Sequence, residues 1–134
     1  MKNTIRLFFL IAFAACGVAR AQVTVVYDGD TATVSVPDSL NQYLTVTQQG
    51  AHVSIAQGSN LASEITYNLS GSSSDGGFYM SGSYKATVEL NGLTLANTSA
   101  VYSGAAVHIQ NGKRINVKVV TGTTNTLVNA ATGS

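Results

Sequence analysis

The sequence predicts an all-β domain. Short segments in which apolar and polar residues alternate recur from residue 23 to residue 119, and alternation at period two is typical of a strand with one buried and one wet face. Glycine, asparagine and serine separate these segments, as turn residues do between short strands. After residue 21, no segment shows the i, i+3, i+4, i+7 apolar spacing of an amphipathic helix.

The first 21 residues are predicted to be a secretory signal peptide. Lys2 and Arg6 precede the uncharged run LFFLIAFAACGV, and the small-residue triplet Ala19-Arg20-Ala21 follows it. The run is shorter than the roughly 20 residues that a membrane-spanning helix needs. We therefore expect cleavage after Ala21 and a location outside the cell or on its envelope. A lipoprotein beginning at Cys16 is the alternative.

Without this segment the chain is weakly acidic. It has 7 Lys+Arg and 6 Asp+Glu in all, and three of the basic residues lie in the first 20, which leaves a net charge of about −2. No basic cluster is present that would neutralise phosphates, so a nucleic-acid partner is not expected. The single cysteine belongs to the signal segment, so no disulfide within the exported chain is expected.

The alternation predicts the strands in chain order. Asp28-Gly29-Asp30 is expected to be a hairpin turn, Pro37 to turn the chain out of the second strand, and residues 70–77 (SGSSSDGG) to form a long loop. Residues 22–62 are expected to form a strand-rich leader or cap, and residues 63–134 the main domain. The expected strands are residues 23–25, 33–36, 44–47, 52–55, 65–69, 87–90, 107–109 and 115–119.

The second half has a repeat-like layout. Asn91-Gly92 and Asn111-Gly112 lie about twenty positions apart, and a similar shift lays Val88 over Val107. Short strands recurring near this period predict a parallel β-helix, in which each coil stacks on the next. The alternative is a β-sandwich of antiparallel hairpins, because Asn-Gly is also a strong hairpin signal. In the β-helix, Asn91 and Asn111 would form an amide ladder.

Several short motifs strengthen the β-helix prediction by resemblance. The segment 67–129 contains DGGFY (75–79), GSYKAT (82–87), LNG (90–92), GAA (104–106), NGKR (111–114) and GTTNTL (122–127). In this order and spacing it resembles the carbohydrate-binding domain family of secreted bacterial right-handed β-helix proteins, whose structural prototype binds polygalacturonate.

The resemblance implies a pectate-lyase-like solenoid that binds acidic or neutral polysaccharide, such as pectin, without cleaving it, and calcium is the cofactor that it suggests, since the prototype binds calcium. The chain departs from the family pattern at two points. It ends at Ser134, where more coils would be expected, so we expect an N-terminal fragment, and Asn129 stands where an aspartate is expected. A structural or adhesin-type β-solenoid of the cell surface is the alternative function.

No catalytic constellation is visible in the sequence. The acids of the exported chain are scattered, whereas calcium-assisted lyases and glycosidases both need carboxylates that face one site. His52 and His108 are far apart and each is expected on an outward, solvent-facing position, and no H-E-x-x-H or G-x-S-x-G motif occurs. We therefore expect a binding protein and not an enzyme.

The expected binding surface is the outer face of the last strands. If Ile115, Val117 and Val119 face the core, their polar neighbours face outward. These ladders of polar side chains could bond sugar hydroxyls, and the cations could meet a uronate carboxylate. Tyr79, Tyr84 and Tyr102 are candidates for stacking on sugar rings. The predicted ligand-binding residues are Glu89, His108, Gln110, Lys113, Arg114, Asn116, Lys118 and Tyr84.

Overall fold

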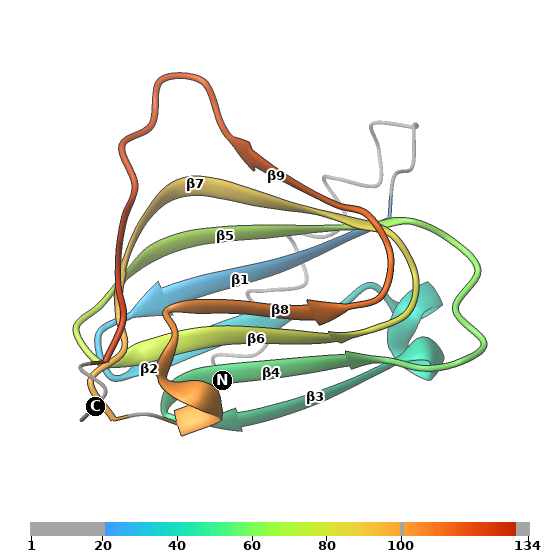
Figure 1. The fold of residues 1–134 in the computed structure, drawn as a ribbon, viewed down its shortest axis with the longest axis horizontal. Coiled ribbons are helices and arrows are strands. Elements are labelled where there is room, and N and C mark those ends of the chain that lie inside the picture. The colour runs from blue at the N-terminus through green and yellow to red at the C-terminus, as the bar shows by residue number, and fades with distance from the viewer. Residues whose placement is uncertain (1–20, 100, 131–134) are drawn as a thin grey trace.

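The computed structural model describes residues 21–99 and 101–130, which fold into two mixed β-sheets (Figure 1). The predicted signal segment before Ala21, including Cys16, lies outside the described residues. Sheet A contains, in spatial order, β2 (Thr31–Ser35), β1 (Gln22–Asp28), β5 (Ile65–Ser73), β7 (Ala86–Ala96) and β10 (Thr126–Val128), and β9 (Ile115–Val119) also pairs with β7. Sheet B contains β3 (Leu44–Gln49), β4 (Ala51–Gln57), β6 (Gly76–Gly82) and β8 (Val107–Asn111).

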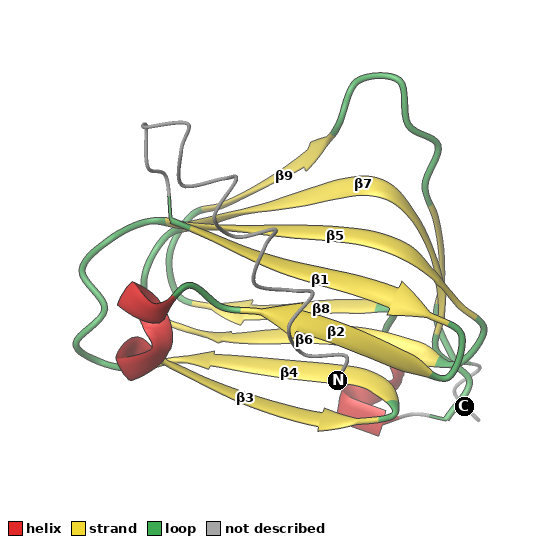
Figure 2. Ribbon diagram, turned by 180° about the vertical axis from the view of Figure 1, so that it is seen from behind, coloured by secondary structure: helices red, strands yellow, loops and turns green. Residues whose placement is uncertain are grey.

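The chain alternates between the two sheets from β4 to β9. The order β4, β5, β6, β7, β8, β9 visits sheets B and A in turn, and each strand from β6 to β9 pairs in parallel with the strand two before it. The last strand, β10, pairs in parallel with β7. Figure 2 shows the resulting two layers, joined by turns at both ends of the strands. The first four strands instead form two antiparallel hairpins, β1–β2 and β3–β4, linked by the 3₁₀ helix η1 (Asp38–Tyr43).

The core lies between the sheets. Alternate residues of each inner strand point into it, as the burial of Val23 and Val25 in β1 and of Phe78 and Met80 in β6 shows. Tyr67 and Phe78 meet there with ring centroids 5.8 Å apart. Residues 22–62 supply strands to both sheets, so they share this core with the rest of the described chain.

The predicted all-β class is confirmed, and every predicted strand lies within or overlaps an observed one. The Asp28-Gly29-Asp30 hairpin turn is also confirmed, with Gly29 at φ 68°. The predicted long loop over residues 70–77 is wrong: β5 continues to Ser73 and β6 begins at Gly76. Glycine at 76 serves close strand packing here, because a Cβ would lie 2.7 Å from the Ala51 carbonyl oxygen.

The predicted superposition of Val88 on Val107 is also wrong. Val88 lies beside Val117 in sheet A, whereas Val107 lies beside Phe78 in sheet B. The Asn91-Gly92 pair does not end its strand, since β7 runs through it with an irregular register against β5. Asn91 donates to Asn68, 3.4 Å away, and not to an amide of the other Asn-Gly pair.

Strand β9 lies at an open edge. Val117 and Val119 are register partners of the buried Val88 and Leu90, so they face the core side as predicted. They are nevertheless 60% and 56% exposed. The expectation that they are core residues is therefore wrong for the described chain, because none of its strands packs over them.

Candidate functional site

Three turns come together at one end of the sheets. Each connects a strand of sheet B to the following strand of sheet A: β4 to β5, β6 to β7 and β8 to β9. Ile65, Ala86 and Ile115 are register partners across sheet A. The residues immediately before them, Glu64, Lys85 and Arg114, therefore precede equivalent positions of three adjacent strands, which lie roughly 4.8 Å from one another across the sheet.

These turns enclose a groove of about 480 Å³, called the basic groove below. It combines three cations with one acid, a hydroxyl, an amide and an aromatic ring. Its lining residues are Glu64, Ser83, Tyr84, Lys85, Lys113, Arg114 and Asn116. Arginine and lysine here could meet carboxylates, and the remaining groups could bond hydroxyls, so the groove suits an anionic ligand rich in hydroxyls.

An amide network holds the turns in place. Gln57 accepts a hydrogen bond from the Tyr84 backbone N–H through Oε1 (3.0 Å), and its Nε2 donates to the Tyr67 hydroxyl (3.2 Å). Asn111 donates to the same Gln57 oxygen (3.2 Å) and to the Tyr84 carbonyl (2.9 Å), and accepts from the Lys113 N–H (2.8 Å). Burial raises the pKa of Tyr67, although the hydrogen bond from Gln57 lowers it. The side chains of Gln57 and Asn111 thus fix the backbone that presents Tyr84 and Lys113.

The cations are concentrated in this groove. The described chain holds only four Lys and Arg residues, and Lys85, Lys113 and Arg114 line the groove. The fourth, Lys118, lies on the outer face of sheet A, with its Nζ 3.9 Å from a carboxylate oxygen of Glu89. Because Lys118 is 63% exposed, this pair contributes little to stability, of the order of 0–1 kcal/mol.

The eight predicted binding residues fall in three places. Tyr84, Lys113, Arg114 and Asn116 line the basic groove. Glu89 and Lys118 form a ladder on sheet A with Asn68, which donates to Glu89 Oε1 at 2.9 Å. His108 and Gln110 lie on sheet B, away from both. The predicted stripe of Arg114, Asn116 and Lys118 is thus divided, with only its first two members in the groove.

Sequence reasoning missed Glu64, Ser83, Lys85 and Gln57. A usable signal was present, because Glu64, Lys85 and Arg114 are each the polar residue directly before a strand of sheet A. Without the register between those strands, however, the sequence does not show that they are neighbours.

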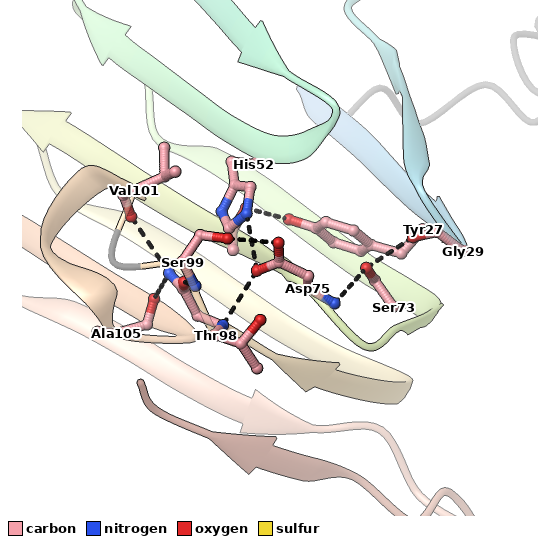
Figure 3. Close-up of polar contacts among 11 residues, drawn as sticks. Tyr27, Gly29, His52, Ser73, Asp75, Thr98, Ser99, Val101 and Ala105 are labelled. Carbon is pink, nitrogen blue, oxygen red and sulfur yellow. Dashed lines mark hydrogen bonds and ion pairs between the residues drawn. The ribbon is translucent and has the colours of Figure 1, made fainter. Parts of the chain in front are cut away.

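A second polar cluster lies at the opposite end of the strands (Figure 3). Asp75 accepts hydrogen bonds from the Ser99 hydroxyl (2.5 Å) and the Thr98 N–H (3.0 Å), and His52 Nε2 lies 3.2 Å from it. The Ser99 hydroxyl, followed by the Thr98 N–H and His52, holds the pKa of Asp75 well below its usual range. Ser99 and His52 both contact Asp75 and not each other, which is not the arrangement of a nucleophile and its base. The contacts of Asp75 with Thr98 and Ser99 instead connect the β5–β6 turn to the segment after β7, and this cluster is called the clamp.

His52 corrects one prediction. It was expected to be exposed to solvent, but only 5% of its surface is accessible. Its strand neighbour is Gly77, and a Cβ at Gly77 would contact both His52 and the segment that carries Asn97 and Ala105. That segment therefore covers the outward side of β4 at this point.

The described residues contain no group of three or more His, Cys, Asp and Glu side chains able to hold a metal ion. The nearest approach in sequence is Asp28 and Asp30, which flank the glycine of a tight hairpin turn. Calcium takes six to eight oxygen ligands, a larger set than this pair supplies.

Comparisons with known proteins give no relative. No protein-family model, no curated protein and no solved structure matches the chain. Within the described residues, no helix is long and apolar enough to pass through a membrane.

Proposed function

We propose that this protein binds an acidic polysaccharide without cleaving it, and that the basic groove is the binding site. Polygalacturonate, the backbone of pectin, is the first ligand to test. The protein would act outside the cell, after removal of the signal segment predicted before Gln22.

The observation that carries this proposal is the gathering of Lys85, Lys113 and Arg114 in one groove of a chain that is otherwise poor in cations. Three cations beside a single acid, Glu64, leave the groove with net positive charge, which favours an anionic ligand. Lys85 and Arg114 belong to neighbouring turns, so a ligand with repeated carboxylates could meet both at once. Tyr84 and Asn116 add an aromatic face and an amide, which suit a sugar more than a bare anion.

The fold adds support of a second kind. Strands that alternate between two sheets and pair in parallel with the strand two before are what a β-helix requires, and we infer that β4 to β9 are successive sides of right-handed coils. The two hairpins formed by β1 to β4 would cap the helix at its start. A structural or adhesin-type β-solenoid would have the same architecture and no glycan ligand, so binding separates the two functions.

A calcium requirement rests on the family resemblance alone. None of the groove contacts described above depends on a metal ion, so calcium dependence is tested separately from binding.

Native gel electrophoresis through polygalacturonate tests the proposal. We expect the protein to be retarded by polygalacturonate and to migrate freely through fully methyl-esterified pectin, which has the same backbone without the charges. Added salt should reduce the retardation because it screens exposed charges. Chelation with EDTA in a parallel gel tests calcium. Equal migration with and without polygalacturonate, under every condition, would exclude the proposal and favour the structural alternative.

A further inference from the structure

The outer face of sheet B carries an aromatic cluster that the proposed function does not use. In β6, Phe78 and Met80 point into the core, so Tyr79 points outward. Its neighbours on the adjacent strands are Ser54 in β4 and His108 in β8. We call Tyr79, Tyr102, His108 and Gln110 the tyrosine patch.

The rings of the patch are packed together. Tyr79 and Tyr102 stack with centroids 6.1 Å apart and planes 20° apart, and His108 meets Tyr79 edge-on with centroids 4.8 Å apart. The Tyr79 hydroxyl donates to Gln110 Oε1 at 2.5 Å, and the Ser103 hydroxyl lies 2.7 Å from His108 Nδ1. These contacts orient the Tyr79 hydroxyl and the His108 ring, and they leave the Gln110 NH₂ group as a donor for a ligand. The Tyr102 hydroxyl is buried without a hydrogen-bond partner in the described chain, so Tyr102 contributes its ring alone.

Tyr102 reaches the patch at a conformational cost. It lies at φ 49°, and Ser103 follows at φ 83°, in the short 3₁₀ segment η2 (Val101–Gly104). Two successive residues with a Cβ in the left-handed region are unusual, and such strain persists only where surrounding contacts hold it. Asn97 supplies those contacts by donating to the Val101 and Ala105 carbonyls, while the Gly104 carbonyl accepts from the Ala130 N–H. The loop is therefore fastened on both sides of the tyrosine that it presents.

A shallow depression of about 540 Å³ adjoins the patch. It is lined by Ser81, Gly82, Gln110, Asn111 and Gly112, and Gln110 belongs to both features. Neither the depression nor the patch contains a lysine, arginine, aspartate or glutamate side chain. Lysine and arginine of the described chain lie instead in the basic groove or, for Lys118, on sheet A.

This chemistry defines the ligand. Fixed aromatic rings next to amides, a hydroxyl and open backbone offer stacking to the apolar face of a pyranose ring and hydrogen bonds to its hydroxyls. A carboxylate or sulfate would find no cation with which to pair. We propose that the tyrosine patch and its depression form a second binding site, for an uncharged sugar chain, separate from the basic groove.

The test uses gels containing hydroxyethyl cellulose, galactan or galactomannan, beside a polygalacturonate gel. At least one neutral polymer should retard the protein, and salt should leave this retardation unchanged. Tyr79→Ala should weaken it roughly tenfold, the scale of one lost aromatic contact. Gln110→Ala, at an exposed position, should weaken it while leaving the melting temperature near that of the parent.

The paired variant Lys85→Ser/Arg114→Ser is the matched control, since it alters only the basic groove. It should keep full retention on the neutral polymer, and Gln110→Ala should keep full retention on polygalacturonate. Free migration of the parent through all three neutral gels would overturn the second site. So would neutral-polymer retention that Gln110→Ala and Tyr79→Ala leave intact. Free migration through the polygalacturonate gel, together with retardation by a neutral polymer, would overturn the proposed function and support this second site.

Discussion

Replacing Gly71 with alanine tests the packing of β1 against β5. Gly71 lies directly opposite Tyr27 at φ 91°, and an added Cβ would lie 2.1 Å from the Tyr27 carbonyl oxygen and 2.8 Å from its nitrogen. Backbone atoms cannot rotate away as the end of a side chain can, so β1 must shift. Tyr27 is buried in the core and its hydroxyl donates to the Gly77 carbonyl at 2.8 Å, so the shift also disturbs the contact between the sheets.

Gly92 provides a matched control. It has a similar φ of 73°, but an added Cβ would meet nothing within 4 Å. Alanine in a left-handed conformation costs about 1–2 kcal/mol, partly offset by the reduced entropy of the unfolded chain. We expect Gly92→Ala to cost about 1 kcal/mol. For Gly71→Ala we expect at least about 3 kcal/mol, because several ladder hydrogen bonds worth about 1 kcal/mol each are strained as well.

Urea and thermal denaturation of the two variants measure the difference. At about 4 °C per kcal/mol for a domain of this size, Gly71→Ala should lower Tm by at least about 12 °C, and Gly92→Ala by about 4 °C. Equal losses for the two variants would refute the described pairing of β1 with β5.

Three further predictions concern single clusters. The Asp75 pKa is lowered in the folded protein by Ser99 and Thr98, so its contribution to stability is present above the usual pKa of about 3.9 and is lost as the pH falls below it. Tm should therefore decline below about pH 4, and Asp75→Asn should lower Tm at pH 7 and flatten that decline; an unchanged acid profile would contradict the clamp. Glu64→Gln removes the only acid of the basic groove and should strengthen retention on polygalacturonate about two- to fivefold, whereas weaker retention would contradict the electrostatic argument. Exposed valines on the edge strand β9 are expected to make the protein self-associate, and Val117→Ser with Val119→Ser should reduce this association as measured by light scattering. A parent that stays monomeric, or association that the variant leaves unchanged, would contradict this expectation.

The strands were predictable because alternation is a local property. The alternation identifies the buried side of a strand without knowledge of its partner strands, as it does for Val53 and Ile55 in β4 and for Val88 and Leu90 in β7. Strand β6 was missed because Gly76 and Gly77 were interpreted as turn residues. Their small size instead allows neighbouring backbone and side chains to approach closely, which no local pattern reveals.

The arrangement of the strands was less predictable than their existence. The apparent repeat aligned Val88 with Val107, but alternation does not show to which sheet a strand belongs, and these two lie in different sheets. The same limit applies to His52. Its outward position on β4 followed from the pattern, while its burial depends on a distant segment that covers it.

The candidate site was predicted in part for the same reason. Lys113, Arg114 and Asn116 are close in sequence, so their common location needed no knowledge of the fold. Lys85 joins them only because Ala86 and Ile115 are register partners, and Gln57 acts on the groove from the end of β4, far from Tyr84 in sequence. Lys118 shares a strand with Asn116, yet its nearest acid is Glu89 and it lies outside the groove.

Retention of two charge variants on polygalacturonate tests the central claim most directly. Lys85→Ser/Arg114→Ser removes two groove cations, and Lys118→Ser removes an exposed cation of the same sheet outside the groove. All three side chains are exposed, so both variants should melt close to the parent. Each exposed contact contributes little by itself, but a polymer engages many sites at once. We therefore expect polygalacturonate to retain Lys85→Ser/Arg114→Ser at least roughly fivefold more weakly than the parent, and to retain Lys118→Ser about as well as the parent. Equal retention of the parent and the groove variant, or a larger loss for Lys118→Ser, would contradict the assignment of the groove as the binding site.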